Sequence, residues 1–174
     1  MHVSTLDPSH VSAYRALMLE AYEQAADAFT TTAAERRAEP DSWWVKRIGS
    51  TTGLATSFGA WDGEGLVGTV AIEYSAKPKT SHSALVLGMY VTASHRARGV
   101  GRSLMQAAIA AASGRSELLV LTLTLTEGNE PALRLYQSLG FVIWGIEPLA
   151  IRAESGIKGK VHMALVLRQP TVAA

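Results

Sequence analysis

The stretch Ala84–Met105, "ALVLGMYVTASHRARGVGRSLM", decides the fold because its character changes twice within a short span. Its first part, Ala84–Val91, is an almost continuous apolar run, which indicates a strand that is buried on both faces. A polar turn with Gly99 and Gly101 follows. The next apolar residues recur at spacings of three and four, which predicts a helix: Leu104, Met105, Ala108, Ile109 and Ala112. A buried strand therefore runs through a basic turn directly into a helix.

The turn has the form R-x-x-G-x-G, with Arg96, Gly99 and Gly101, and it stands where the helix begins. Backbone N–H groups in the first turn of a helix lack intrahelical partners, and the helix dipole stabilises a nearby negative charge by roughly 0.3 to 1 kcal/mol. Glycine lets an anion approach the main chain, and arginine adds charge. The turn thus predicts an anion cradle, although taken alone it is equally compatible with a solvated surface turn.

Two nucleotide-binding motifs are excluded at this turn. The nucleoside-triphosphate loop G-x-x-x-x-G-K-[ST] is absent from the sequence. The dinucleotide fingerprint G-x-G-x-x-G fails because Leu104 stands where its third glycine should be. Any anion that binds here is therefore expected to belong to another class of ligand.

Length and composition indicate one domain. With 174 residues, 48% of them hydrophobic, we expect a single domain over residues 1–174, with a core at about 1–168 and a short tail at 169–174. The net charge of +1 gives no reason to expect nucleic acid or an anionic membrane as a partner. The absence of cysteine excludes disulfides and a cysteine nucleophile, and we expect no metal. The chain shows no leader or membrane span, so we expect a cytoplasmic protein.

The remaining patterns predict seven strands and four helices. The "DGEG" turn indicates a hairpin, since glycine adopts positive φ at low cost. Residues 120–126 alternate Leu with Thr, which is typical of a half-buried strand. In chain order we expect a strand at 2–6, helices from Asp7 to about Ala26 and around 43–48, strands at 54–61, 66–75 and 84–91, the helix after the turn, a strand at 117–126, a helix at 129–140, and strands at 141–147 and 160–167.

This order gives an α/β (α+β) fold with a central mixed β-sheet of about seven strands flanked by about four helices. The centre of the sheet is a strand, helix, strand unit with the R-x-x-G-x-G turn at its crossover. Ligands favour the carboxyl ends of such strands. Exposed edges of a mixed sheet, together with the apolar last strand, also favour a homodimer.

A second motif lies one strand further along the chain. Its form is N-x-x-A-x-x-L-Y-x-x-x-G-F, made by Asn129, Ala132, Leu135, Tyr136, Gly140 and Phe141. Together with the first motif, and with the element order of nearly the whole chain, it resembles the GNAT superfamily of N-acetyltransferases. The resemblance implies the GNAT-like acyl-coenzyme A N-acyltransferase fold, with acetyl-coenzyme A as cosubstrate. It also implies transfer of the acetyl group to the primary amine of a small molecule, by direct attack through a tetrahedral intermediate.

Two other functions stay open within this resemblance. The acceptor of the acetyl group is a peptide or protein N-terminus in some members. A chain of this fold could also serve as a non-catalytic sensor of acyl-coenzyme A. Tyr136 and Asn129 favour an enzyme over a sensor.

The resemblance also implies roles for individual residues. The backbone of the turn would hold the pyrophosphate of acetyl-coenzyme A. The preceding strand would offer backbone groups to the pantetheine arm, while neighbouring strands splay apart to admit it. Tyr136 would lie near the sulfur and protonate the departing thiolate as a general acid. The implied cofactor-binding residues are Met89, Tyr90, Val91, Arg96, Ala97, Arg98, Gly99, Val100, Gly101, Arg102, Ser103, Asn129, Ala132 and Tyr136.

The general base is less clear, because the central strand carries no acid or histidine. Our leading candidate is Glu73, a lone acid in an apolar run that we expect to be partly buried, although an exposed position at a strand end is equally compatible. We expect His82 and His162 to be structural or exposed, and ordered water could accept the proton instead.

The acceptor site is weakly marked in the sequence. Trp43, Trp44 and Phe29 fall in the region that lines it in this superfamily, although tryptophans at helical spacing are more often core residues. Many relatives carry acidic residues where Gly159 and Lys160 stand here. A strongly cationic acceptor is therefore less expected.

Overall fold

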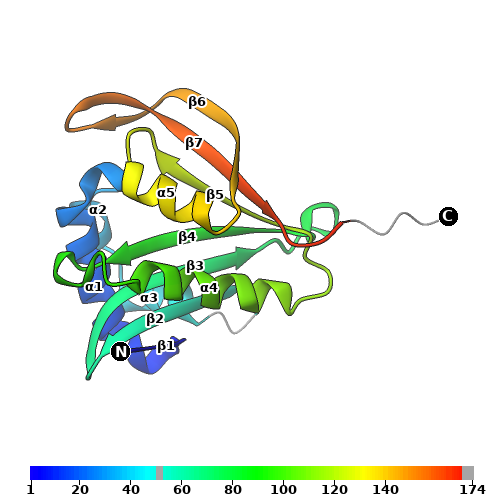
Figure 1. The fold of residues 1–174 in the computed structure, drawn as a ribbon. Helices are drawn as coiled ribbons and strands as arrows, with labels where there is room; N and C mark the ends of the chain where they lie inside the picture. The colour runs from blue at the N-terminus through cyan, green and yellow to red at the C-terminus, as the bar shows by residue number, and fades with distance from the viewer. Residues whose placement is uncertain (50–52, 170–174) are drawn as a thin grey trace.

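The computed structural model describes residues 1–49 and 53–169. Seven strands form one sheet in the order β1-β2-β3-β4-β5-β7-β6, with helices on both of its faces (Figure 1). Of the predicted tail at 169–174, all but Gln169 lies outside the described residues. The strands are β1 (His2–Thr5), β2 (Ala55–Asp62), β3 (Gly65–Tyr74), β4 (Ser83–Val91), β5 (Val120–Thr126), β6 (Val142–Ala153) and β7 (Gly156–Val166); the helices are α1 (Val11–Gln24), α2 (Ala33–Arg37), α3 (Asp41–Ile48), α4 (Val100–Ser113) and α5 (Glu130–Ser138).

The sheet is mixed, as predicted. Strands β1 to β4 run antiparallel to their neighbours, and β4 and β5 are parallel and joined through α4. Strand β7 then enters between β5 and the edge strand β6. The predicted strand, helix, strand unit is therefore confirmed at the centre of the sheet, with the turn before α4 at its crossover.

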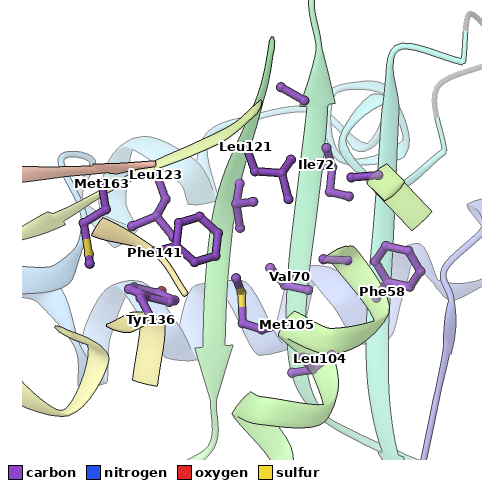
Figure 2. Packing of buried hydrophobic residues seen from close by; sticks show 14 of the residues in the cluster. Phe58, Val70, Ile72, Leu104, Met105, Leu121, Leu123, Tyr136, Phe141 and Met163 are labelled. Atoms are coloured by element: carbon purple, nitrogen blue, oxygen red, sulfur yellow. The ribbon is translucent and has the colours of Figure 1, made fainter. Parts of the chain in front are cut away.

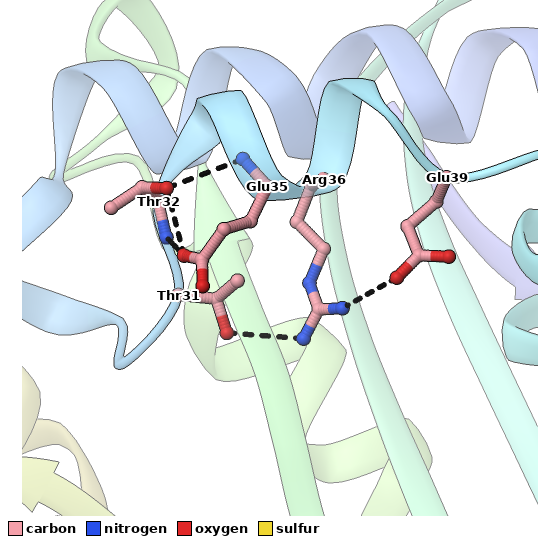
Figure 3. Close-up of polar contacts among 5 residues, drawn as sticks. All are labelled: Thr31, Thr32, Glu35, Arg36 and Glu39. Atoms are coloured by element: carbon pink, nitrogen blue, oxygen red, sulfur yellow. Dashed lines mark hydrogen bonds and ion pairs between the residues drawn. The ribbon is translucent and has the colours of Figure 1, made fainter.

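Helix α2 is the one α-helix in the described residues that the sequence analysis missed. The polar run before Pro40 had been interpreted as a break between helices. In the structure the Glu35 amide donates to the Thr32 hydroxyl (3.3 Å), and the Thr32 amide donates to the Glu35 carboxylate (2.7 Å), as Figure 3 shows. This reciprocal cap is the T-x-x-E capping box, a signal that could have predicted the helix.

The last two strands are longer than predicted. The expected strands at 141–147 and 160–167 are wrong in extent, because β6 and β7 continue into a long hairpin that closes at Gly156. No strand was expected over residues 148–159, which include Pro148. Strand β6 tolerates this proline because it lies at the sheet edge, where a register shift between Glu147 and Ile151 removes the need for its missing N–H.

Strand β4 is not buried on both faces, which corrects the prediction made from its apolar run. Ala84 and Val86 are buried, whereas Leu85 is 39% exposed. Strand β4 also pairs with β5 only at Ser83–Leu85, and a register shift against β3 follows near Gly88. Beyond that point the two parallel strands separate, so the splay implied by the family resemblance is present.

Two hydrophobic cores lie on opposite faces of the sheet. The larger core packs α4 and α5 against the sheet, with Leu104, Met105, Tyr136 and Phe141 among its members (Figure 2). The smaller core packs α1 and α3 against the other face, around Trp44. Because each core fixes one wall, the gap between β4 and β5 is held open between two rigid layers.

Candidate active site

A cleft of about 1390 Å³ opens where β4 and β5 diverge. Its walls come from α1, the carboxyl half of β4, the turn before α4, the end of β5 and the start of α5. All the predicted site residues line it except Arg98 and Ser103, both of which are exposed to solvent. The structure therefore brings together two motifs and a strand that are far apart in the sequence.

The turn before α4 presents unpaired backbone donors. Ala97 and Gly99 have positive φ values of 58° and 81°, and α4 begins at Val100. The Ser103 amide donates to the Gly99 carbonyl (3.0 Å), which makes Ser103 the first residue whose N–H is used by the helix. Ser103 therefore cannot offer its amide to a ligand as predicted. The amides of Val100, Gly101 and Arg102 have no acceptor among the described residues and remain available to an anion.

Gly99 and Gly101 serve different purposes in this turn. A Cβ at Gly99 would have no neighbour within 4 Å, so lack of room does not explain this glycine. Its φ of 81° does, because residues with a side chain rarely adopt this left-handed conformation. At Gly101 the requirement is room: a Cβ would lie 3.0 Å from Met89 Cε and 3.3 Å from Leu135 Cδ2. Gly101 thus keeps open the passage between β4 and α5.

Two of the arginines are partly committed to the fold. Arg96 donates from Nε to the Val91 carbonyl (3.0 Å), and its guanidinium lies 5.6 Å from the centre of the Tyr90 ring. Arg102 donates to the Ser138 hydroxyl of α5 (2.7 Å). These contacts shape the turn and hold α4 beside α5, and the other guanidinium N–H groups add positive charge to the mouth of the cleft.

The Tyr90 side chain contacts α1 as well as Arg96. Its hydroxyl donates to Glu20 of α1 (2.9 Å), and burial together with this carboxylate raises the pKa of Tyr90. The Tyr90 ring belongs to the smaller core, whereas the edge of β4 beyond Leu85 has no strand partner on the β5 side among the described residues. What this part of β4 offers a ligand is therefore mainly backbone.

Asn129 and Tyr136 line the cleft at the start and near the end of α5. The Tyr136 ring is 7% exposed, and its centroid lies 6.0 Å from that of Phe141. Burial raises the pKa of Tyr136 to about 12, so the phenol is protonated at neutral pH and can donate. Asn129 caps α5 by accepting from the Ala132 amide (3.3 Å), which leaves its side-chain NH₂ for a ligand.

Glu73 lies on the cleft but is exposed, so the expectation of partial burial is wrong. In β3 it lies between the buried residues Ile72 and Tyr74, and because successive side chains of a strand point to opposite faces, the Glu73 side chain lies on the other face of the sheet. Among the described residues Glu73 is the one acidic side chain that lines the cleft. His82 is exposed, and His162 contacts Glu147 (3.4 Å) and Trp144 instead of the cleft.

Several residues that line the cleft were not predicted from the sequence, among them His95. His95 lines the cleft and is held by Asp62 (3.1 Å) and Thr92 (2.9 Å). Trp44 is fully buried and is a core residue, whereas Phe29 lines the cleft. Tyr14, Tyr22, Arg36 and Arg47 line it as well, and no motif in the sequence marked them.

In residues 1–49 and 53–169 no group of three or more His, Cys, Asp or Glu side chains could hold a metal ion. No helix in these ranges combines the length and apolarity needed to cross a membrane.

Comparison with known proteins gives a consistent result. The family model "Acetyltransferase (GNAT) family" matches residues 15–141. The L-amino acid N-acetyltransferase AaaT of Escherichia coli (strain K12) is 30% identical over 105 residues, which span 60% of this chain and 64% of that protein. The solved "Structure of yncA, a putative acetyltransferase from Salmonella typhimurium with its cofactor Acetyl-CoA" matches with a TM-score of 0.81 at 18% identity, covering 100% of this chain and 98% of that one. The ribosomal-protein-S18-alanine N-acetyltransferase from Escherichia coli matches with a TM-score of 0.76 at 17% identity, covering 99% and 97%.

Proposed function

The chain belongs to the GNAT acetyltransferase family, and we propose that it transfers the acetyl group of acetyl-coenzyme A to the primary amine of a small molecule. One observation carries this proposal. A single cleft runs from the free amides at the start of α4, through the gap between β4 and β5, to the buried Tyr136 phenol. Along the cleft, backbone amides that can bind phosphate come first, then a channel, then a proton donor. Acetyl-coenzyme A presents its pyrophosphate, its pantetheine arm and its thioester in the same order.

We propose that the amides of Val100, Gly101 and Arg102 bind the pyrophosphate. Arg96, Ala97 and Gly99 shape this cradle, and Arg98 adds charge at its rim. The backbone of Met89–Val91 then guides the pantetheine arm. Asn129 and Ala132, at the start of α5, contact the arm from the other side. All of these residues except Arg98 line the same cleft, which supports this assignment.

The proposed reaction proceeds by direct transfer. The amine lone pair attacks the thioester carbonyl carbon and forms the C–N bond, and the tetrahedral intermediate then expels the thiolate as the C–S bond breaks. The Tyr136 phenol donates to the departing sulfur. Because an ordinary thiol has a pKa of about 8.5, below that of this phenol, the donated hydrogen bond stabilises the thiolate before the proton moves.

The attacking amine must first lose the proton of its ammonium form. We propose that Glu73 accepts this proton, directly or through ordered water, because it is the one carboxylate on the cleft among the described residues. Its exposed position lets the proton pass on to solvent. The nitrogen of the tetrahedral intermediate loses its second proton to solvent as the intermediate collapses, and the Tyr136 phenolate regains a proton from solvent. Over one turnover the ammonium therefore loses two protons, the departing sulfur gains one, and one proton is released.

Binding and transfer are tested separately. Titration calorimetry with acetyl-coenzyme A should show saturable binding, and thiol release should then depend on an added amine. A panel of small amines, amino acids and short peptides distinguishes a small-molecule acceptor from a peptide N-terminus. Saturable binding without thiol release for any amine would favour the non-catalytic sensor, and no binding would contradict the proposal.

A further inference from the structure

Four polar side chains from three separate segments gather at the α1–α3 end of the cleft. They are Tyr14 and Tyr22 of α1, Arg36 of α2 and Arg47 of α3, and all four line the cleft. The Cζ atoms of Arg36 and Arg47 each lie 4.5 Å from the centre of the Trp43 ring. Burial raises the pKa of the Tyr14 phenol, and the nearby charges of Arg47 and Arg36 partly oppose that effect. We call these four residues the arginine-tyrosine pocket.

Arg36 is held rigidly in this pocket. Figure 3 shows its guanidinium between the Thr31 hydroxyl (3.0 Å) and the Glu39 carboxylate (3.4 Å). Its Nε is buried and has no partner among the described residues. The side chain is only 20% exposed, and the capping box at Thr32 fixes the helix that carries it. Such preorganisation lowers the entropy cost of binding an anion.

Arg47 carries a charge that no carboxylate in the described residues neutralises. Its side chain forms no ion pair in this part of the chain, and it is ordered by stacking on Trp43. Lys46 of α3 and Lys160 of β7 also line the cleft. Glu73 is the one acidic side chain on the described cleft wall, so the acceptor region carries a positive excess.

We propose that the arginine-tyrosine pocket binds a carboxylate of the acceptor, so that the substrate is a small amino acid with a free primary amine. This inference rests on the proposed function. A guanidinium matches the two oxygens of a carboxylate, and phenol hydroxyls donate to the same group. The apolar wall beside the pocket, formed by Met18 and Phe29, suits an apolar side chain of the amino acid. A polyamine would meet like charges here and is disfavoured.

The test compares three acceptors that differ only in the carboxyl group: methionine, methioninamide, and the corresponding decarboxylated amine. Values of kcat/KM are measured with saturating acetyl-coenzyme A and corrected for the fraction of free amine. Because a hydrogen bond to a charged partner is among the stronger ones, we expect the wild-type protein to prefer methionine by about tenfold to hundredfold. The preference should arise mainly in KM.

Variants assign the preference to the pocket. Arg47→Gln should raise KM for methionine by about tenfold or more while changing kcat/KM for methioninamide by less than about threefold. Arg47→Lys should restore part of the preference. The matched control is Arg37→Gln, which removes an exposed α2 arginine that pairs with Glu23 and does not line the cleft. Circular dichroism and the acetyl-coenzyme A Kd verify that each variant is folded.

Each outcome separates this inference from the proposed function. The inference is wrong if the wild-type protein acetylates methionine and methioninamide equally well. It is also wrong if Arg47→Gln lowers kcat/KM for both acceptors by the same factor, because the arginines would then only pack on Trp43. If no amine is acetylated although acetyl-coenzyme A binds, the proposed function itself fails. Transfer to the decarboxylated amine alone would overturn the carboxylate site while leaving acetyl transfer intact.

A second, independent observation concerns the edge strand β6. This strand pairs only with β7 among the described residues, and several of its apolar side chains are exposed. Val142 is 62% exposed, Trp144 63% and Ile146 57%, and Ile143 is exposed as well. A free edge with large apolar side chains is an aggregation hazard unless something covers it.

We propose that a second copy of the chain covers β6 about a two-fold axis, through packing of the apolar side chains at Val142–Ile146. A register shift between Ile143 and Gly145 interrupts the strand in this segment, so side-chain packing rather than main-chain pairing would form the contact. Such a contact is isologous and covers the exposed apolar side chains of both copies at once. The four side chains present apolar area on the order of a few hundred Å² per protomer, comparable to the apolar share of the roughly 800 Å² that each partner of a standard interface buries. This agreement favours a second copy over a small ligand.

Light scattering after size exclusion, from about 1 to about 100 µM protein, tests this surface. The wild-type protein should form a dimer, and Trp144→Lys should shift it to monomer without changing acetyl-coenzyme A affinity. Ile157→Lys, an exposed apolar position on β7 beyond this edge segment, is the control and should remain dimeric. A monomeric wild-type protein throughout this range, or a Trp144→Lys variant that remains dimeric, would contradict the proposal.

Discussion

At the scale of single residues, the account depends most on the Tyr136 hydroxyl. Tyr136→Phe keeps the ring in contact with Phe141 and removes only the donor. General acid catalysis typically contributes about 10²- to 10⁴-fold, so we expect kcat to fall within that range. The acetyl-coenzyme A Kd from calorimetry should change little. An unchanged kcat would show that Tyr136 is not the general acid.

The pH dependence of transfer follows from the raised pKa of Tyr136. The acceptor ammonium must deprotonate, and ordinary primary amines have pKa values of about 8 to 10, so kcat/KM should rise with pH below that value. An unperturbed phenol would lose its proton near pH 10, whereas burial raises the pKa of Tyr136 to about 12. The profile should therefore show no descending limb up to about pH 10.5. A decline that begins near pH 9 and is absent in Tyr136→Phe would contradict this assignment.

Glu73→Gln tests the base at the same scale. Because Glu73 is exposed, we expect a loss of about tenfold to hundredfold in kcat/KM near neutral pH, at the low end for general base catalysis. The loss should shrink as the pH passes the pKa of the acceptor amine, because free amine needs no base. Thiol release measured across that range checks the trend. A loss that stays constant with pH would point to substrate binding rather than proton removal.

Sequence reasoning found single residues well where a motif fixed their position. Tyr136 and Asn129 line the cleft as expected, because the sequence marks the start and the end of the helix that positions them. Glu73 also lines the cleft, but its exposure was not predicted, because burial at a strand end depends on which distant elements cover that part of the sheet. The amide of Ser103 was misjudged because it already donates to the Gly99 carbonyl, as the first hydrogen bond of α4, and only the structure defines where that helix begins.

At the scale of elements, the turn before α4 should bind mainly through its backbone. In Gly101→Val the new side chain would enter the space held by Met89 and Leu135, so we expect acetyl-coenzyme A affinity to fall by about tenfold or more. Arg98 is exposed and touches no wall of the cleft, so Arg98→Ala should cost less than about fivefold. Calorimetry on both variants checks the order. The reverse order would show that arginine charge, not the exposed main chain, holds the anion.

Elements with strong local signals were predicted from sequence, and those that depend on distant partners were not. The "DGEG" hairpin and the α5 caps at Asn129 and Gly140 were found because turn and cap chemistry is local. Helix α2 was missed although its capping box is local as well. The open face of β4 was not predictable, because its apolar residues line a cleft that forms only where β5 diverges.

At the scale of the whole molecule, the fold followed from the order of the elements, whereas the acceptor side did not. The β4, α4, β5 unit constrains the centre of the sheet through a crossover of fixed hand. Arg36 and Arg47, by contrast, belong to different helices and meet only because both stack on Trp43. Such a contact between surfaces of helices leaves no spacing in the sequence that would reveal it.

The most direct test of the central claim measures both products of one reaction. Purified protein is incubated with acetyl-coenzyme A and methionine, and the free thiol and the N-acetylated amino acid are quantified in the same samples. The account predicts that the two appear in equal amounts, at a rate that Tyr136→Phe strongly lowers. Thiol release without an N-acetylated product from any amine of the panel, or no release at all, would contradict it.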